Sequence, residues 1–377
     1  MKIVVNTRLL LKDRLEGIGW FSFETLKRIT SAHPEVDFVF LFDRPYAEEF
    51  IFGENIVPVV IPPQARHPIL FYIWFEFAVK YQLKKQKADL FLSPDGYLPL
   101  STDVKSVAVI HDLNFEHYPK DVPFRDRMYY HRFFPKFAEK ASRIATVSEY
   151  SKRDIIQSYG IQESKIDVVY NGANLGFIPL GEEEKRSVRQ KYTGGSPFFI
   201  FIGSLHPRKN MARLFKAFDA FIEKNGAEMR LLIVGQKKNW TSEIENAFLA
   251  MKNKEYVVFT GRMPSEELHT VLASAFALAY VPYFEGFGIP IMEAFYCGTP
   301  VITSNITSMP EISGDAACLV DPFSVESITD GLEKVYKDPV YRMDLIQKGN
   351  ERKNLFTWDR SASLLWDCML RALEEKY

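Results

Sequence analysis

Two glutamates, Glu285 and Glu293, stand on either side of a pair of glycines in residues 283–300. The segment follows a predicted strand, and Pro290 and Gly298 suit the first position and the C-terminal cap of a helix. The backbone amides just before that helix should gather at its N-terminus, where unpaired N–H groups and the helix dipole bind anions. These amides belong to Gly286, Phe287, Gly288 and Ile289.

The two glutamates would then flank a phosphate cradle. Glycines at this point leave room for a diphosphate to approach the backbone. A carboxylate that binds a ribose diol is the usual partner of a phosphate held at a helix N-terminus in nucleotide-binding sheets. The alternative interpretation is a glycine-containing turn with a solvated glutamate on each side.

Arg208 and Lys209 stand in a second strand, loop and helix segment, residues 201–210, which also carries Gly203. Open α/β sheets bind their ligands just beyond the carboxyl ends of strands. Arginine can bind phosphate through two parallel hydrogen bonds, and lysine can add a point charge. The segment therefore indicates a phosphate site, with a solvated basic pair before a helix as the alternative.

In the first half of the chain, His111 directly follows a predicted buried strand, with Asp112 next to it. A histidine at a strand end is either a catalytic group or a structural hydrogen bonder, and Asp112 would orient it or cap the next segment. Gly17 and Gly19 lie between the first strand and a helix, in a predicted loop that can approach a ligand closely.

The elements that position these residues alternate between strands and helices, which is typical of parallel sheets wrapped by helices. We expect an α/β fold with two doubly wound Rossmann-like domains, at residues 1–180 and 196–357, separated by a stretch of glycine, proline and charge. A helical stripe at residues 358–377 must dock an apolar face, and we expect it to pack on the first domain. The predicted strands cover residues 2–6, 38–42, 56–61, 90–92, 106–110, 143–147, 165–169, 198–202, 230–234, 256–260, 276–281 and 300–304.

The composition excludes several classes of protein. The 377 residues carry 47 Lys and Arg against 48 Asp and Glu, a net charge of −1, which gives no electrostatic case for nucleic-acid binding. Three cysteines without paired spacing indicate a reducing compartment rather than a disulfide or zinc framework. Neither a signal peptide nor a membrane-spanning run is visible, so we expect a cytoplasmic protein.

Missing motifs narrow the chemistry further. The chain has no G-x-x-x-x-G-K-[ST] motif, and the G-x-G pairs at Gly17 and Gly286 do not extend to G-x-G-x-x-G. It has no G-x-S-x-G elbow either, so ATPase, simple dehydrogenase and serine hydrolase activities are not favoured. No D-x-D pair is present to hold a divalent ion against a diphosphate, and we expect neither a metal nor another cofactor.

Taken together and in this order, the motifs resemble the retaining glycosyltransferases of family four, in which two facing Rossmann-like domains form the GT-B fold. The resemblance extends to residues 146–151, 304–311 and 321–322. It implies a site in the cleft between the domains. This chain departs from the family at Ser204, where the family often has Arg, and at Pro282, where it often has Ser.

The resemblance also implies a role for each candidate residue. Glu293 would hold the ribose hydroxyls, and Glu285 would face the donor sugar. Arg208 and Lys209 would grip the diphosphate, while His111 would lie beside the transferred sugar. The remaining donor-binding positions would be Gly17, Gly19, Gly203, Gly286, Phe287, Gly288 and Ile289.

We therefore expect a metal-independent hexosyltransferase of polysaccharide biosynthesis, which moves a hexose from a nucleoside-diphosphate sugar to a glycan or lipid-linked glycan. Residues 207–210, 304–305 and 310–311 look most like the mannosyltransferase branch of the family, which favours GDP-mannose as the donor and a UDP-hexose second. The alternatives are a sugar-nucleotide epimerase or phosphorylase of the same fold, and a catalytically inert sugar-nucleotide-binding protein.

Residues 69–87 and 124–136 mix aromatic with basic side chains. Such segments can rest on an anionic membrane, which would place the protein at the inner face of the membrane through peripheral contact. The alternative is that the aromatic side chains pack into the core and the basic ones are solvated. Residues 124–136 could also border the acceptor groove.

Overall fold

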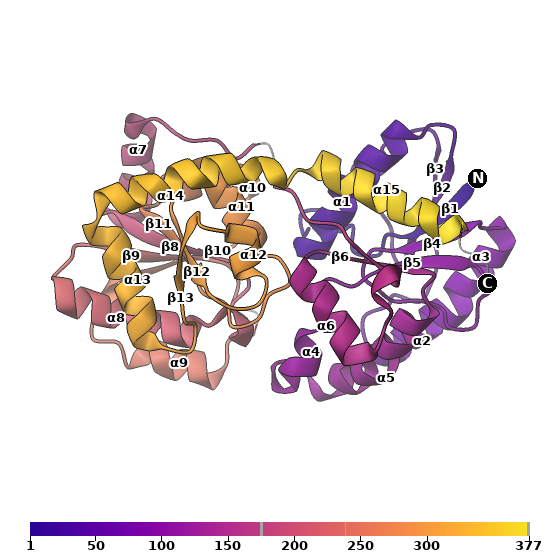
Figure 1. Ribbon diagram of the computed structural model, residues 1–377, viewed down its shortest axis with the longest axis horizontal. Coiled ribbons are helices and arrows are strands. Elements are labelled where there is room, and N and C mark those ends of the chain that lie inside the picture. The colour runs from indigo at the N-terminus through magenta and orange to yellow at the C-terminus, as the bar shows by residue number, and fades with distance from the viewer. Residues whose placement is uncertain (174–175, 238, 375–377) are drawn as a thin grey trace. The chain divides into compact units, whose positions relative to one another are not determined.

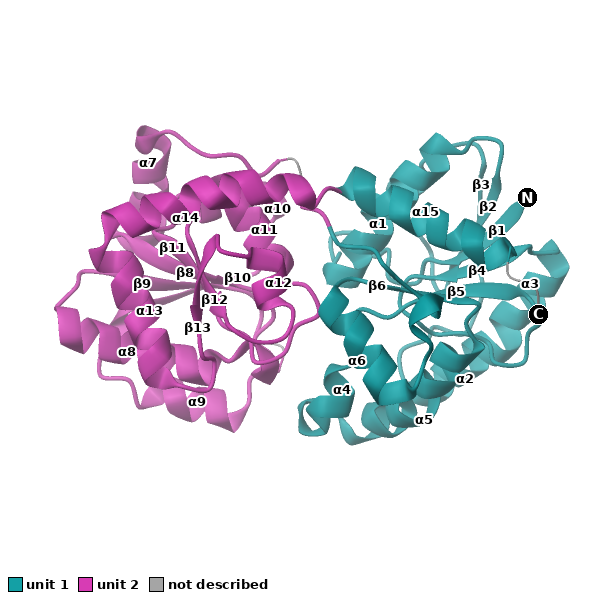
Figure 2. Ribbon diagram, in the orientation of Figure 1, with its two compact units in different colours: residues 1–171, 358–377 teal, residues 172–357 magenta. Residues whose placement is uncertain are grey.

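The computed structural model describes residues 1–173, 176–237 and 239–374. The chain divides into two compact units (Figure 2): unit 1 contains residues 1–171 and 358–377, and unit 2 contains residues 172–357. Residues 375–377, at the end of the predicted C-terminal helix, lie outside the described part.

Unit 1 is built on a seven-stranded parallel sheet in the order β3-β2-β1-β4-β5-β6-β7 (Figure 1). The central strands are short, rich in β-branched and aromatic residues, and buried on both faces, as expected for parallel strands between two helix layers. The strands are β1 (Lys2–Asn6), β2 (Asp37–Phe42), β3 (Ile56–Val60), β4 (Leu90–Ser93), β5 (Lys105–Val109), β6 (Arg143–Thr146) and β7 (Ile166–Val168).

Helices cover both faces of this sheet. Ile3 and Val5 of β1 pack toward one helix layer and Val4 toward the other, because successive side chains of a strand point to opposite faces. The first layer contains α1 (Gly17–Ala32) and α15 (Trp358–Glu374), which pack side by side (Figure 1). The second contains α2 (Pro68–Ile73), η2 (Trp74–Val79), α3 (Lys80–Gln86), α5 (Phe124–Lys140) and α6 (Glu149–Tyr159). Short turns are η1 (Glu48–Phe50), α4 (Asn114–His117), η3 (Pro119–Asp121) and η4 (Glu163–Lys165).

Unit 2 is built on a six-stranded parallel sheet in the order β10-β9-β8-β11-β12-β13. Its strands are β8 (Phe198–Ile202), β9 (Arg230–Val234), β10 (Val257–Gly261), β11 (Ala277–Tyr280), β12 (Val301–Ser304) and β13 (Ala317–Val320). One group of packed helices contains α8 (Met211–Asn225), α9 (Ser242–Leu249) and α13 (Val325–Lys337). The other contains α7 (Glu182–Thr193), α10 (Ser265–Ala273), α11 (Ile289–Cys297) and α14 (Pro339–Arg352). Shorter elements are η5 (Pro207–Lys209), η6 (Lys254–Tyr256), α12 (Met309–Ser313) and η7 (Lys353–Leu355).

The strand order reverses once in each sheet, between β1 and β4 in unit 1 and between β8 and β11 in unit 2. At such a reversal the chain leaves the two neighbouring strands toward opposite faces, and a crevice opens at the carboxyl edge of the sheet. The loops that follow these four strands are therefore where each unit is built to carry chemistry.

The fold class predicted from the sequence is confirmed, because both sheets are parallel and covered by helices. Every predicted strand is present, and its ends lie within one residue of the prediction. The sequence pattern does not predict the edge strand β13, since its Ala317 and Cys318 lack the β-branched or aromatic signal of the other strands.

Residues 181–195, which the sequence places between the two domains, belong to unit 2, and residues 182–193 form helix α7. Three glutamates lie in its first turn, where their negative charge interacts favourably with the positive end of the helix dipole. The Gly181 amide donates to the Glu184 carboxylate at 3.1 Å. Lys191 pairs with Glu267 of α10 at 2.8 Å. The charged residues of this segment therefore stabilise the start of α7 and connect the helix to α10.

Candidate active site

The neighbouring strands β8 and β11 bring two loops together at the carboxyl edge of the unit 2 sheet. One loop runs from Gly203 to the turn η5, and the other covers residues 281–288 before α11. The backbone amide of Tyr283 donates to the carbonyl of Arg208 at 3.0 Å, so the loops are hydrogen-bonded to each other. The two segments that the sequence marked as phosphate sites therefore lie side by side.

Four side chains form an ion cluster here, which we call the Glu285 cluster: Arg208, Lys209, Tyr280 and Glu285. Arg208 Nη1 lies 2.8 Å from Glu285 Oε2, and Lys209 pairs with the same carboxylate. Lys209 also donates to the Tyr280 hydroxyl at 2.5 Å, and Tyr280 donates to Glu285 at 3.1 Å. Two cations and one carboxylate give the cluster a net charge of +1.

The Glu285 carboxylate is largely buried, with 14% of its side chain exposed. Burial alone would raise the pKa of Glu285, but attraction to Arg208 and Lys209 lowers the pKa to about 2. Glu285 is therefore ionised at neutral pH and is a weak base.

Two residues that hold the loops in place were missed by the sequence analysis. Asn210 adopts a left-handed conformation, with a φ of 64°, directly after η5. Its side-chain amide donates to the carbonyls of Val281 and Pro322, at 3.0 and 2.7 Å. Ser308 donates to the Glu285 carbonyl at 2.7 Å. An asparagine before a helix is visible in the sequence, but its link to distant carbonyls depends on the order of the strands.

Glu293 lies on α11, and burial raises the pKa of its carboxyl to about 7. Within the described residues, no hydrogen bond or ion pair joins this carboxyl to another side chain. Gly288, with a φ of 91°, leads into the helix, and a Cβ there would lie 2.9 Å from Met309 Cε. The predicted helix is therefore present as α11, and Glu293 lies on it.

The three other predicted glycines have different surroundings. Gly203 directly follows β8 and has a φ of 147°. Its carbonyl lies so close to Gly235 that a Cβ on Gly235 would be 1.8 Å away from it. Gly17 and Gly19 do not lie in a loop as predicted, because α1 already begins at Gly17. A Cβ on Gly19 would lie 3.0 Å from the Leu9 carbonyl, so this glycine allows close packing of the helix on the preceding segment.

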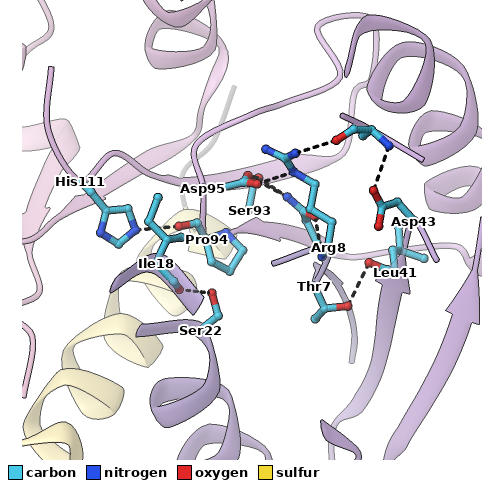
Figure 3. Close-up of polar contacts among 12 residues, drawn as sticks. Thr7, Arg8, Ile18, Ser22, Leu41, Asp43, Ser93, Pro94, Asp95 and His111 are labelled. Atoms are coloured by element: carbon cyan, nitrogen blue, oxygen red, sulfur yellow. Dashed lines mark hydrogen bonds and ion pairs between the residues drawn. The ribbon is translucent and has the colours of Figure 1, made fainter. Parts of the chain in front are cut away.

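His111 follows β5 at the carboxyl edge of the unit 1 sheet (Figure 3). Its Nε2 donates to the Pro94 carbonyl at 2.8 Å, and its ring meets Phe21 edge-on at 5.1 Å. Burial lowers the pKa of His111, so the imidazole is neutral at neutral pH. Asp112 accepts a hydrogen bond from the Asn114 amide at 3.1 Å, which caps the next turn.

Two family models match the chain: Glycosyltransferase Family 4 over residues 16–177 and Glycosyl transferases group 1 over residues 182–352. O-antigen chain mannosyltransferase B of Escherichia coli is 27% identical over 95% of this chain and 97% of its own length. O-antigen chain mannosyltransferase RfbU of Salmonella typhimurium is 24% identical over 82% of each chain. The Anabaena protein Alr3699/HepE, solved in complex with UDP and glucose, has a TM-score of 0.75 and 15% identity, over 97% of this chain and 98% of that one.

The chain therefore belongs to the GT-B glycosyltransferases whose two halves these family models describe. The resemblance to mannosyltransferases of polysaccharide biosynthesis is confirmed by the O-antigen relatives. Across residues 1–173, 176–237 and 239–374, no helix combines the length and the hydrophobicity that a membrane-spanning segment needs.

We expect Glu285→Gln to remove an acid-sensitive part of the free energy of unfolding. Because the folded chain lowers the pKa of Glu285 from 4.5 to about 2, the wild type has this stabilisation above about pH 4.5 and loses it as the pH falls toward 2. The full effect is on the order of 3 kcal/mol. Urea unfolding of the wild type and of Glu285→Gln at about pH 5 and about pH 3 measures the free energy of unfolding. We expect this free energy to fall more from about pH 5 to about pH 3 in the wild type than in the variant.

Glu182→Gln is the matched control, because the pair of Glu182 with Lys185 is exposed and contributes little. This variant should follow the wild type at both pH values. If Glu285→Gln also followed the wild type, the buried ion cluster would not stabilise unit 2 as described.

Proposed function

We propose that this glycosyltransferase moves mannose from GDP-mannose to a glycan or lipid-linked glycan acceptor, with retention of the anomeric configuration. The observation that carries the proposal is the Glu285 cluster, a largely buried group of net charge +1 that joins the turn η5 to the loop before α11, the helix that carries the buried Glu293. A nucleoside diphosphate has the matching groups, since its phosphates suit the cations and its ribose diol suits a carboxylate. The O-antigen relatives support mannose as the sugar.

A bound diphosphate would compete with Glu285 for Arg208 and Lys209. As the bond between the anomeric carbon and the phosphate oxygen breaks, negative charge grows on the diphosphate. Preorganised cations and backbone amides can stabilise such growing charge by several kcal/mol. Glu285 would then be free to contact hydroxyls of the donor sugar, which is the role that the family resemblance implies.

Retention follows if the acceptor attacks from the face that the diphosphate leaves. The acceptor oxygen forms the new bond to the anomeric carbon, and its proton passes to the departing phosphate oxygen. In this scheme the groups of unit 2 bind and neutralise charge, and His111 contributes a hydrogen bond to the sugar. No divalent ion is needed, because Arg208, Lys209 and the start of α11 supply the positive charge.

We expect GDP binding to release protons through Glu293. At neutral pH roughly half of these carboxyls are protonated, since their pKa is about 7, and hydrogen bonds from ribose hydroxyls favour the charged form. Titration calorimetry at pH 7 in buffers of different ionisation enthalpy counts the protons released. Glu293→Gln should lose this release and bind GDP at least tenfold more weakly, as expected when a charge-assisted hydrogen bond is lost. Unchanged proton release and affinity would contradict the ribose assignment.

The donor is tested by mass spectrometry of GDP-mannose and UDP-hexoses incubated with acceptor extract in the presence of EDTA. We expect mannose transfer from GDP-mannose, only when acceptor is present and with no loss of rate in EDTA. Conversion of the donor without acceptor would favour an epimerase or phosphorylase. The competing donor is a UDP-hexose, and competitive calorimetry that showed UDP binding at least tenfold tighter than GDP would overturn GDP-mannose.

We further propose that unit 1 rests on the anionic inner face of a membrane, where a lipid-linked acceptor would be held. The outer sides of α2, η2, α3 and α5 expose large apolar side chains, which we call the apolar patch. It consists of Ile69, Tyr72, Ile73, Phe77, Tyr81, Phe124 and Met128. Exposed basic residues lie among and beside them, namely Lys80, Lys84, Lys85, Lys87, Arg125, Arg132 and Lys136.

The two sides of these helices differ in exposure. Phe71, Trp74 and Phe134 are buried in the core of unit 1, whereas the apolar patch is exposed. Tyr72 of α2 packs 5.9 Å from Phe133 of α5, which makes the surface continuous across the two helices. Exposed apolar patches mark interaction sites, and interleaved basic residues fit anionic lipid head groups.

We expect the protein to cosediment with vesicles that contain phosphatidylglycerol and not with pure phosphatidylcholine vesicles. Phe77→Ser with Tyr81→Ser should weaken the binding about tenfold or more, because each buried aromatic ring contributes apolar area. Val340→Ser with Met343→Ser removes equally exposed apolar groups from α14 of unit 2 and should bind as the wild type. Equal vesicle binding by both double variants would contradict a membrane role for the apolar patch.

A further inference from the structure

A buried ion pair lies at the reversal of strand order in unit 1, and none of the roles described so far uses it. Arg8 follows β1 and Asp95 follows β4, two neighbouring strands at the centre of the sheet. Arg8 Nε lies 2.6 Å from Asp95 Oδ2, and only 8% and 4% of the two side chains are exposed. Figure 3 shows the pair and the nearby His111.

Aromatic rings enclose the Arg8 guanidinium, which lies 5.0 Å from the ring centre of Phe71 and 4.7 Å from that of Tyr97. Its Nη1 also donates to the Ala65 carbonyl at 3.3 Å. A buried ion pair gains little net stability over apolar residues of the same volume, because both charges lose their water. The pair is therefore better explained by the geometry that it fixes than by folding free energy.

That geometry is the position of residues 93–95. The second oxygen of Asp95 accepts hydrogen bonds from Asn6 Nδ2 at 2.8 Å and from the Ser93 hydroxyl at 3.0 Å. Arg8 thus holds one oxygen of the carboxylate, and donors from β1 and β4 hold the other. Pro94 stands between Ser93 and Asp95, and its ring fixes φ. Because both neighbours are held by hydrogen bonds, the direction of the Pro94 carbonyl is restricted.

The Pro94 carbonyl accepts the hydrogen bond from His111 Nε2 (Figure 3). Because a carbonyl can only accept, Nε2 carries the proton and Nδ1 carries the lone pair. The edge-on contact with Phe21 limits rotation of the imidazole ring. Among the described residues, Nδ1 has no hydrogen-bond partner.

We propose that Arg8 and Asp95 are positioning residues, which act through the Pro94 carbonyl to hold His111 in its Nε2-protonated form and to present Nδ1 as a hydrogen-bond acceptor for a hydroxyl of the substrate. A sugar ring supplies such hydroxyls. Their identity rests on the proposed function, whereas the tautomer of His111 does not.

The tautomer is read directly by long-range ¹H–¹⁵N NMR of protein labelled with ¹⁵N-histidine. The chain has seven histidines, and His111→Gln assigns the signal of His111. We expect a single Nε2-protonated form in the wild type at neutral pH. Arg8→Met with Asp95→Leu removes both charges, so no unpaired charge stays buried, and it should give a mixture of tautomers. Arg8→Lys can keep the ion pair and should keep the single form.

Arg143→Met with Asp167→Asn is the control, because this ion pair, 2.7 Å apart, belongs to the same unit but lies on β6 and β7, at one end of the strand order and away from β1 and β4. It should leave His111 in one tautomer. With GDP-mannose, the Arg8 and Asp95 double variant should lose about tenfold or more in kcat with the donor KM within about threefold, and Arg8→Lys should restore kcat.

If the double variant fails to fold, Asp95→Asn replaces it, because Asn keeps the shape of the side chain but cannot accept every one of these hydrogen bonds. A Nδ1-protonated His111 in the wild type would overturn the proposal. So would a folded variant without the pair that kept both a single tautomer and wild-type kcat. If the wild type transferred no mannose from GDP-mannose, the proposed function would fail while the NMR result would still decide the positioning role.

Discussion

In both units, charged side chains pair with one another at the carboxyl ends of the two strands between which the strand order reverses. In unit 1 they are Arg8 and Asp95, which neutralise each other among aromatic rings. In unit 2 the two cations Arg208 and Lys209 pair with the single carboxylate of Glu285, so the cluster has a net charge of +1. The two groups of side chains differ in net charge. A neutral, enclosed ion pair can fix the backbone around it, whereas a cluster with excess positive charge attracts an anion.

The sequence predicts the place of the unit 2 site because carboxyl ends of parallel strands share one edge of a sheet. Arg208, Lys209 and Glu285 were assigned to this edge from the strands before them, and the structure brings them together. Their mutual pairing could not be predicted, since it requires β8 and β11 to be neighbours although β9 and β10 separate them along the chain. Tyr280 resembles any core aromatic of a strand, and periodicity says nothing about where its hydroxyl points.

The unit 1 pair was missed for a related reason. A single arginine after the first strand has no spacing that marks it, and its partner Asp95 comes 87 residues later. Local patterns also misplaced the start of α1, because the apolar spacing becomes visible only after the helix has begun at Gly17. Sequence patterns thus located strands and strand ends well, whereas contacts between distant strand ends needed the sheet topology.

Glu293 is costly for the fold, because burial raises the pKa of its carboxyl to about 7 and makes ionisation unfavourable. The folded chain therefore loses stability as the pH rises from about 4.5 toward 7, where the unfolded carboxyl is already ionised. Such a cost is characteristic of residues kept for binding rather than for packing.

The same pKa shifts bear on which group takes the proton of the acceptor. Glu285 is a weak base, since its pKa is about 2. His111 donates its Nε2 proton in a hydrogen bond to the Pro94 carbonyl. Glu293 has the pKa of a general base, but a ribose that hydrogen-bonds to its charged form would lower this pKa and occupy its oxygens. The departing phosphate differs from all three, because its basicity rises as its bond to the sugar breaks. Proton transfer to that phosphate is therefore consistent with the electrostatics of the described side chains. It places the departure of the diphosphate and the attack of the acceptor oxygen on the same face of the sugar.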